Sequence, residues 1–259
     1  MSLSAPTLRA CVVVPARDEE DLIVSCLRAL ATQTGVGPDE YEVLLVLDHC
    51  NDRTEARARE IGAAHPRLGL RFLQGPGEGS GAARRVGMDA ACSRLLGMGL
   101  PEGLIACTDA DTVVAPDWLE VQFRAVSEGA RAIGGRIELA DDGTLPEGVR
   151  NRHAQQGRLR HEILLSEPGP AGKTQHWQFS GASLTLTAAT YKQVGGLQPR
   201  TDLEDEHLEA VLRHNGIPID RLLSVRVKTS PRLRGRARRG LSHDLARIAT
   251  KLREERAEG

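Results

Sequence analysis

Two aspartates one residue apart follow a short apolar run near the middle of the chain. Residues 104–107 predict a buried strand, and Asp109 and Asp111 stand where that strand ends. Open α/β sheets bind ligands at the carboxyl ends of their strands. Two acids at such an end are costly unless a positive charge lies between them. Three interpretations follow: a Mg²⁺ or Mn²⁺ site for a nucleotide diphosphate, a phosphatase with Asp109 as nucleophile, or a solvated turn.

The position of this Asp-x-Asp pattern along the chain separates the interpretations. A haloacid-dehalogenase-type phosphatase carries its nucleophile on an early strand and a later acidic pair after an apolar strand. Here three predicted strands precede Asp109, and the later acidic pair, Glu204 and Asp205, opens a predicted helix. The buried strand before Asp109 counts against a plain turn. The metal-binding interpretation is therefore favoured.

The later acidic pair is a candidate for proton transfer. The pattern Thr201-Asp202-Leu203-Glu204 is typical of a capping box and predicts a helix up to about residue 214. Glu204 then has a structural role, whereas Asp205 precedes Leu208 and Leu212 of the apolar stripe at helical spacing. A carboxylate on this inward face is suited to act as a general base. We therefore favour Asp205 over Glu204 for that role.

Two loops in the first half are suited to hold a nucleotide. Asp48 follows the predicted strand 42–47, where an acid accepts hydrogen bonds from a nucleobase or a ribose. Residues 75–81 are rich in glycine and lead into a helix, and Gly79 permits an anion to approach the start of that helix. Either Arg84 or Arg85 is placed to add a charge-assisted contact to phosphate. A flexible turn explains the same glycines equally well.

Two segments in the second half complete the candidate site. Gly181 interrupts a predicted strand over residues 177–187, which indicates either close approach of a ligand or an edge-strand kink. Residues 221–239 contain eight basic residues and no acid, among them Arg232, Arg234 and Arg236. We favour a phosphate-binding lid. The alternatives are an anionic-acceptor site, a membrane or nucleic-acid patch, and a solvated loop.

Alternating strands and helices must position these residues. We expect strands at 10–15, 42–47, 70–73, 104–107, 132–139, 177–187 and 222–227. We expect helices from the acidic turn 18–20 onward and at 54–64, 82–96, 117–127, 146–165, 201–214 and 241–256. Pro15 is expected to end the first strand. This order predicts an α/β fold with βαβ units and a mostly parallel sheet flanked by helices.

A single domain over residues 1–259 follows from the lack of a long linker or an internal repeat. Residues 1–130 form the nucleotide-binding half, and residues 131–220 supply a second site. Residues 221–259 form the basic lid and a closing helix.

Composition excludes several classes of function. A net charge of −1 gives no general attraction to nucleic acid or membranes, and 3% aromatic residues argue against base-stacking surfaces. Five scattered cysteines without a Cys-x-x-Cys pair indicate neither a disulfide framework nor a zinc site, and favour a cytoplasmic setting. We see no signal peptide, and no apolar run approaches the roughly twenty residues of a transmembrane helix.

Six segments in this order resemble family 2 glycosyltransferases of the GT-A fold. They are residues 12–20, 45–54, 77–83, 108–111, 179–183 together with 194–197, and 204–208. Each motif alone is modest, but six in the right order are specific. The resemblance implies a metal-dependent enzyme that moves a hexose from a nucleotide-diphosphate sugar to an acceptor hydroxyl.

The resemblance also implies a role for each site residue. The nucleobase and ribose pocket is lined by Pro15, Ala16 and Glu19, with Asp48 on the base. Gly79 and Arg84 approach the diphosphate, and Asp109 and Asp111 hold Mg²⁺ or Mn²⁺. The acceptor side comprises Gly181, Ala182 and Glu204, and Asp205 deprotonates the acceptor. Arg232, Arg234 and Arg236 form the phosphate lid.

The chain is also similar to synthases of glucosylglycerate and mannosylglycerate, whose acceptors are small and anionic. Those enzymes retain the anomeric configuration and lack a clear Glu-Asp helix start, so inversion is expected here. Many family 2 members carry Asp-Asp-Gly-Ser where this chain has Asp48-His-Cys-Asn. Both UDP-sugars and GDP-sugars therefore stay open as donors. If the protein is not an enzyme, the alternative is a non-catalytic nucleotide-binding domain.

Overall fold

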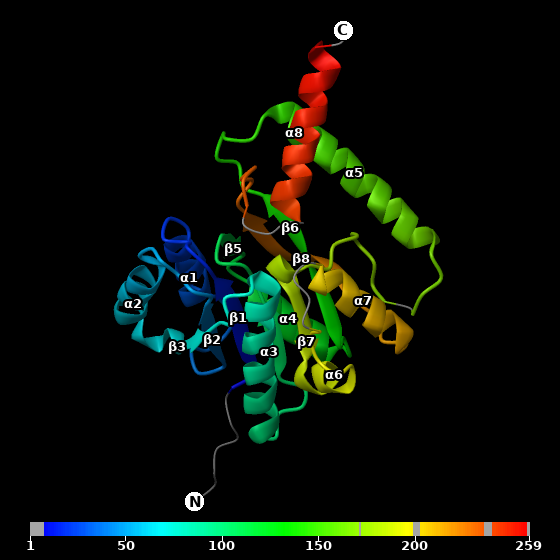
Figure 1. Ribbon diagram of the computed structural model, residues 1–259. Coiled ribbons are helices and arrows are strands. Elements are labelled where there is room, and N and C mark those ends of the chain that lie inside the picture. Colours follow the sequence, from blue (N-terminus) through cyan, green and yellow to red (C-terminus); the bar gives the residue numbers. More distant parts are fainter. Residues whose placement is uncertain (1–7, 171, 199–202, 236–239, 258–259) are drawn as a thin grey trace, which may run out of the picture.

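The computed structural model describes residues 8–170, 172–198, 203–235 and 240–257 (Figure 1). The strands are β1 (Ala10–Ala16), β2 (Tyr41–Leu47), β3 (Leu70–Gln74), β4 (Leu104–Cys107), β5 (Thr112–Val114), β6 (Ala132–Leu139), β7 (Leu184–Thr187) and β8 (Asp220–Thr229). The α-helices are α1 (Ile23–Ala31), α2 (Thr54–Ala64), α3 (Ser80–Gly97), α4 (Trp118–Ser127), α5 (Glu147–Ser166), α6 (Ala188–Gln193), α7 (Glu204–His214) and α8 (Leu241–Ala257).

All the strands belong to one sheet, in the order β3-β2-β1-β4-β7-β6-β8-β5. β1 pairs in parallel with β2 and β4, β2 with β3, and β6 with β8. β7 is antiparallel to both of its neighbours, and β5 is antiparallel to β8. The predicted α/β fold with a mostly parallel sheet is confirmed, and the carboxyl ends of β1, β2 and β4 meet at one edge.

Helices cover both faces of the sheet because the central strands are apolar on both sides. Along β1, Val12 and Val14 belong to an apolar cluster with residues of α1, α2 and α4, whereas Cys11 and Val13 belong to a second cluster with residues of α3, α6 and α7. This alternation is the period of two that a strand imposes. A third, smaller cluster joins α5 to α8, and Figure 1 shows these two helices extending beyond the body of the sheet.

Two predicted boundaries near the first strand are wrong. β1 continues through Pro15 to Ala16, because pairing with β4 stops at Val13 and the missing N–H of Pro15 falls beyond that ladder. The acidic turn 18–20 precedes the helix, which begins at Ile23. The amides of Glu19 and Glu20 are instead bound by side chains at the start of α2.

The predicted strand over 177–187 is wrong in its first part. Only its last four residues, Leu184–Thr187, form a strand. The side-chain amide of Gln178 binds both the N–H and the carbonyl of Ile137, each at 2.9 Å, in place of a backbone ladder. A 3₁₀ turn at Gly181–Ser183 then leads into β7. The irregular backbone places Gly181 and Ala182 at the edge of the sheet rather than within it.

The remaining differences lie in short or basic elements. β5 and α6 were not predicted, since three and six residues carry little periodic signal. The basic segment is part strand, because β8 extends to Thr229 and contains Arg221 and Arg226. The proposed cap Thr201 lies outside the described residues, and α7 begins at Glu204. Within the described part of the chain, no helix has the length and apolarity needed to cross a membrane.

Candidate active site

A cavity of about 1180 Å³ opens at the carboxyl ends of β1, β2 and β4. It contains the predicted site residues Pro15, Ala16, Glu19, Asp48, Gly79, Arg84, Asp109, Asp111, Gly181, Ala182, Glu204, Asp205 and Arg232. Arg234 is exposed and is not among the lining residues, and Arg236 lies outside the described residues. The structure therefore gathers these residues from across the chain into one space. Their individual roles stay predictions.

The Asp-x-Asp segment forms a tight turn after β4. The amide of Thr112 donates to the carbonyl of Asp109 at 3.1 Å, which closes a four-residue turn. Ala110 is buried, while the side chains of Asp109 and Asp111 are 34% and 12% exposed. The two carboxylates thus face the cavity with different access to solvent, which suits Asp109 to meet a ligand more openly than Asp111.

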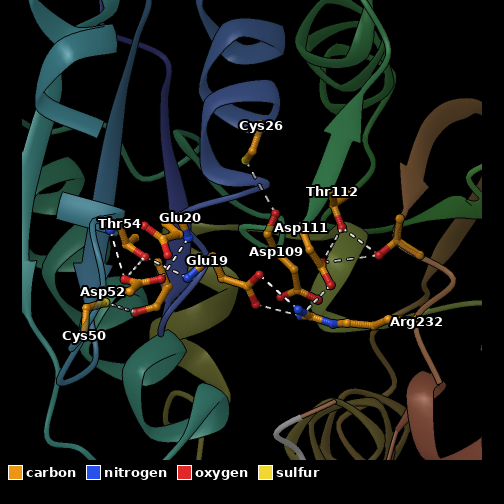
Figure 2. Close-up of polar contacts among 12 residues, drawn as sticks. Glu19, Glu20, Cys26, Cys50, Asp52, Thr54, Asp109, Asp111, Thr112 and Arg232 are labelled. Carbon is orange, nitrogen blue, oxygen red and sulfur yellow. Dashed lines mark hydrogen bonds and ion pairs between the residues drawn. The ribbon is translucent and has the colours of Figure 1, made fainter. Parts of the chain in front are cut away.

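Arg232 lies beside this turn and joins it to the loop after β1 (Figure 2). Its guanidinium donates to the two carboxylate oxygens of Glu19 at 3.0 and 2.6 Å. The same group reaches Asp111 Oδ2 at 2.7 Å. Bidentate pairing of this kind fixes the planar guanidinium in orientation. One predicted lid residue therefore already binds the predicted metal carboxylate and a predicted nucleotide-pocket residue.

The ionised form of the Asp111 carboxylate is disfavoured by its surroundings. Burial and the adjacent Asp109 raise the pKa of Asp111 to about 6, although Arg232 opposes the shift. Thr112 and Thr229 donate hydrogen bonds to Asp111 Oδ1 at 3.2 and 3.4 Å. A further positive charge at this position would favour the ionised form.

Asp48 organises the glycine-rich loop. It is buried, and its carboxylate accepts hydrogen bonds from the amides of Gly77 at 2.6 Å and Gly79 at 3.1 Å. Gly77 and Gly79 both have positive φ, which glycine adopts without strain. Arg17 lies 3.8 Å from the same carboxylate. Asp48 thus shapes the loop directly, and its predicted contact to the nucleobase stays a prediction.

Arg84 is a buried residue that lines the cavity. Its Nη2 donates to Asp109 Oδ1 at 2.7 Å, and its Nη1 pairs with Glu204. Burial lowers the pKa of Arg84, but the charges of Asp109 and Glu204 outweigh burial and raise it overall. For Glu204, burial and the charge of Asp205 outweigh the attraction of Arg84, so its pKa is raised. The contact with Arg84 Nη1 nevertheless occupies the carboxylate of Glu204.

Asp205 is the more accessible member of the pair at the start of α7. Its Oδ2 accepts a hydrogen bond from the amide of Gly181 at 3.2 Å, and its Oδ1 accepts one from Glu206 at 2.9 Å. These bonds hold the carboxylate of Asp205 at the wall of the cavity that Asp109 and Asp111 also line. The preference for Asp205 over Glu204 as the general base stays a prediction.

Sequence reasoning missed the far wall of the cavity. That wall comes from α5 and the segment before the 3₁₀ turn, and includes Arg160 and Trp177. The Arg160 guanidinium lies 4.7 Å from the centre of the Trp177 ring, within cation–π range. No sequence signal pointed to them, because α5 has no clear apolar stripe and the contact spans two elements.

A group of possible metal ligands also lies near the site, but its carboxylates accept hydrogen bonds from backbone amides. Asp18, Cys50 and Asp52 come close together, and Cys50 and Asp52 are labelled in Figure 2. Asp52 accepts bonds from Thr54 and from the amide of Glu20, and Asp18 accepts one from the amide of Asn51. Burial raises the pKa of Cys50, which keeps it a thiol. These contacts explain the cluster as a fastening between two loops.

Comparison with known proteins identifies the family. The sequence profile "Glycosyl transferase family 2" matches residues 11–185. The chain belongs to glycosyl transferase family 2. In this family 2 chain the matched residues run from β1 into β7 and include Asp109, Asp111 and Gly181. Asp205 lies beyond the matched region, so the candidate base rests on the structure and on its motif. None of the curated proteins compared with the chain matches it.

Solved structures share its fold. Mannosyltransferase PcManGT from Pyrobaculum calidifontis, in complex with GDP-Man and Mn²⁺, has a TM-score of 0.63 at 20% identity over 88% of this chain. TarS from S. aureus has a TM-score of 0.62 at 17% identity over 86% of this chain. Residues 1–349 of TarS in complex with UDP-GlcNAc have a TM-score of 0.65 at 18% identity over 94% of this chain.

The family 2 chain spans only part of these proteins, namely 58% of PcManGT, 37% of TarS and 66% of the TarS 1–349 chain. At such identities the likeness establishes the fold and leaves function to the site itself.

Proposed function

We propose that this chain transfers a sugar from a nucleoside diphosphate sugar to a hydroxyl group of an acceptor. One observation carries the proposal: the carboxylates of the Asp-x-Asp turn and of Asp205 open onto the same cavity from different elements. Family membership and the fold shared with a GDP-Man complex and a UDP-GlcNAc complex support it. Transfer needs a leaving-group site and a base site in one space, and this cavity offers both.

The leaving-group site suits a hard divalent cation. Asp109 and Asp111 offer oxygen ligands only, which match Mg²⁺ and Mn²⁺, and burial has made the negative charge of Asp111 unfavourable on its own. These two residues would hold the ion. Its chemistry would be to neutralise the charge that develops on the departing diphosphate. The complex of PcManGT contains Mn²⁺, which supports this choice.

The residues of the chain divide the remaining work between them. Asp205 accepts the proton of the acceptor hydroxyl. The amide of Gly181 orients the Asp205 carboxylate for this step. The acceptor oxygen forms a bond to the anomeric carbon while the bond from that carbon to the diphosphate oxygen breaks. Arg232 adds positive charge beside the leaving group. Attack from the face opposite the leaving group inverts the anomeric configuration.

The test is release of nucleoside diphosphate in the presence of Mn²⁺ from a panel of UDP-sugars and GDP-sugars with mixed hydroxyl acceptors. Asp205→Asn is expected to keep donor affinity and to lower turnover by about 10²-fold or more. The exposed Asp39→Asn is the matched control.

Three outcomes contradict the proposal in different ways. Phosphate release from simple esters without nucleotide binding indicates the phosphatase alternative. Nucleotide binding without turnover for any donor indicates a non-catalytic domain. Full turnover in Asp205→Asn removes the base from its assigned role.

A further inference from the structure

Arg84 contacts three segments that meet only in the folded chain. Its guanidinium reaches Asp109 after β4 and Glu204 at the start of α7, which lie 25 and 120 residues away in sequence. A Cβ atom on Gly181 would lie 2.3 Å from Arg84 Cζ, so the guanidinium lies directly against the backbone of the 3₁₀ turn. Arg84 thus touches the leaving-group end, the acceptor side and the helix of the candidate base.

We propose that Arg84 is a positioning residue that couples charge at Asp109 to the placement of Asp205. The inference rests on the proposed function of the cavity. It assigns Arg84 a task other than direct contact with the diphosphate, because its two terminal nitrogens are engaged by carboxylates.

The coupling follows from charge balance around one buried cation. Only 4% of the Arg84 side chain is exposed, so its two acidic partners compete for it with little screening by water. When positive charge gathers at Asp109, the attraction between Asp109 and Arg84 weakens and Glu204 becomes the stronger partner. The guanidinium of Arg84 then pulls Glu204, and with it the first turn of α7, toward itself.

Two further contacts transmit this change to the base. Glu204 and Asp205 are adjacent in the first turn of α7, so a shift of one backbone position moves the other. Asp205 is tied to Gly181 through the amide at 3.2 Å, and Gly181 lies against Arg84 itself. Arg84, Glu204, Asp205 and Gly181 therefore form a closed circuit, and a planar guanidinium can span it where the single ammonium of lysine cannot.

The experiment is hydrogen exchange of the full chain with and without Mn²⁺ plus UDP or GDP. Two regions are followed: the loop with Gly77 and Gly79, which reports donor binding, and the peptides with Gly181 and residues 204–207, which report the base. In the wild type we expect protection of the first region and a change of about twofold or more in the second. In Arg84→Lys the first response persists and the second is lost.

Arg85→Lys is the matched control, because Arg85 is the next residue on α3, is half-exposed and pairs only loosely with Asp89 at 3.5 Å. Both responses are expected to persist in it. Glu204→Gln removes the charge of the other partner in the Arg84–Glu204 ion pair, and it replaces Arg84→Lys if that variant does not fold. Glu204→Gln is expected to lower kcat about 10-fold at nearly unchanged donor affinity.

The outcomes separate this inference from the proposed function. No response at Gly77 and Gly79 in the wild type overturns donor binding, and the coupling with it. A response there without one at Gly181 and 204–207 overturns the coupling alone. Persistence of the second response in both Arg84→Lys and Glu204→Gln also overturns it.

Discussion

Arg232 donates to both carboxylate oxygens of Glu19 across 213 residues of sequence. The pair brings the segment after β8 onto the loop after β1, and it places a cation at Asp111 as well (Figure 2). The same guanidinium therefore stands where a metal ion and a diphosphate are both proposed to bind. Arg232 should therefore weaken the binding of the metal ion and strengthen the binding of the diphosphate.

Arg232→Ala is expected to strengthen binding of Mn²⁺ alone and to weaken binding of a nucleoside diphosphate. The first follows because Arg232 competes for Asp111, and the second because a cation beside the phosphates is lost. We expect changes of about 3- to 10-fold in each dissociation constant, measured by titration calorimetry, with the second effect shrinking in high salt.

Arg226→Ala is the control for that experiment, since Arg226 is an exposed arginine of β8 with a long 3.7 Å contact to Asp117. Its dissociation constants should match the wild type. If Arg232→Ala left both constants unchanged, the phosphate-lid role of Arg232 would be wrong.

Asp111→Asn is expected to stabilise the ligand-free protein at neutral and alkaline pH. The pKa of Asp111 rises from its ordinary 3.8 to about 6 on folding, so the folded chain holds this proton more tightly than the unfolded chain. The carboxyl therefore favours the fold below about pH 4, and that contribution is lost as pH rises through about 6.

The gain from Asp111→Asn should be about 1–3 kcal/mol in the free energy of unfolding near pH 8, and should vanish near pH 4. Urea unfolding at both pH values without divalent ions measures it, with Asp39→Asn as reference. A variant less stable than the wild type at pH 8 would mean that the attraction of Arg232 outweighs the burial of the charge.

Sequence alone predicted the parts of the fold that local patterns determine. The apolar run 104–107 predicted β4 with its observed bounds, and strand order predicted that Asp109 and Asp111 lie at the sheet edge, where both line the cavity. The same reasoning failed at 177–183, where the Gln178 side chain replaces a backbone ladder. A contact made by one side chain leaves no periodic trace.

The pairings inside the site were beyond sequence reasoning for a different reason. Arg84 was expected to approach the diphosphate, which stays a prediction, but the sequence did not reveal that Arg84 joins two acids that lie far apart in sequence. Glu204 was expected to serve a helix cap, and its partner is Arg84. Which of several acids a buried arginine selects depends on how elements pack, and residue types alone do not encode that choice.

Gly181→Ala tests how closely Arg84 must lie against the 3₁₀ turn. The added Cβ would lie 2.3 Å from Arg84 Cζ, and the guanidinium can withdraw only by loosening its bonds to Asp109 and Glu204. We expect a loss of about 2–4 kcal/mol in the free energy of unfolding, because overpacking and a weakened buried ion pair add together.

Gly97→Ala provides the contrasting control, since a Cβ there meets nothing within 4 Å and the residue ends α3. Helix propensity favours alanine, so this variant should be unchanged or more stable by up to about 1 kcal/mol. Urea unfolding compares the two variants. Equal stability of Gly181→Ala and the wild type would show that the turn can move away from Arg84, and would remove Gly181 from the circuit that positions Asp205.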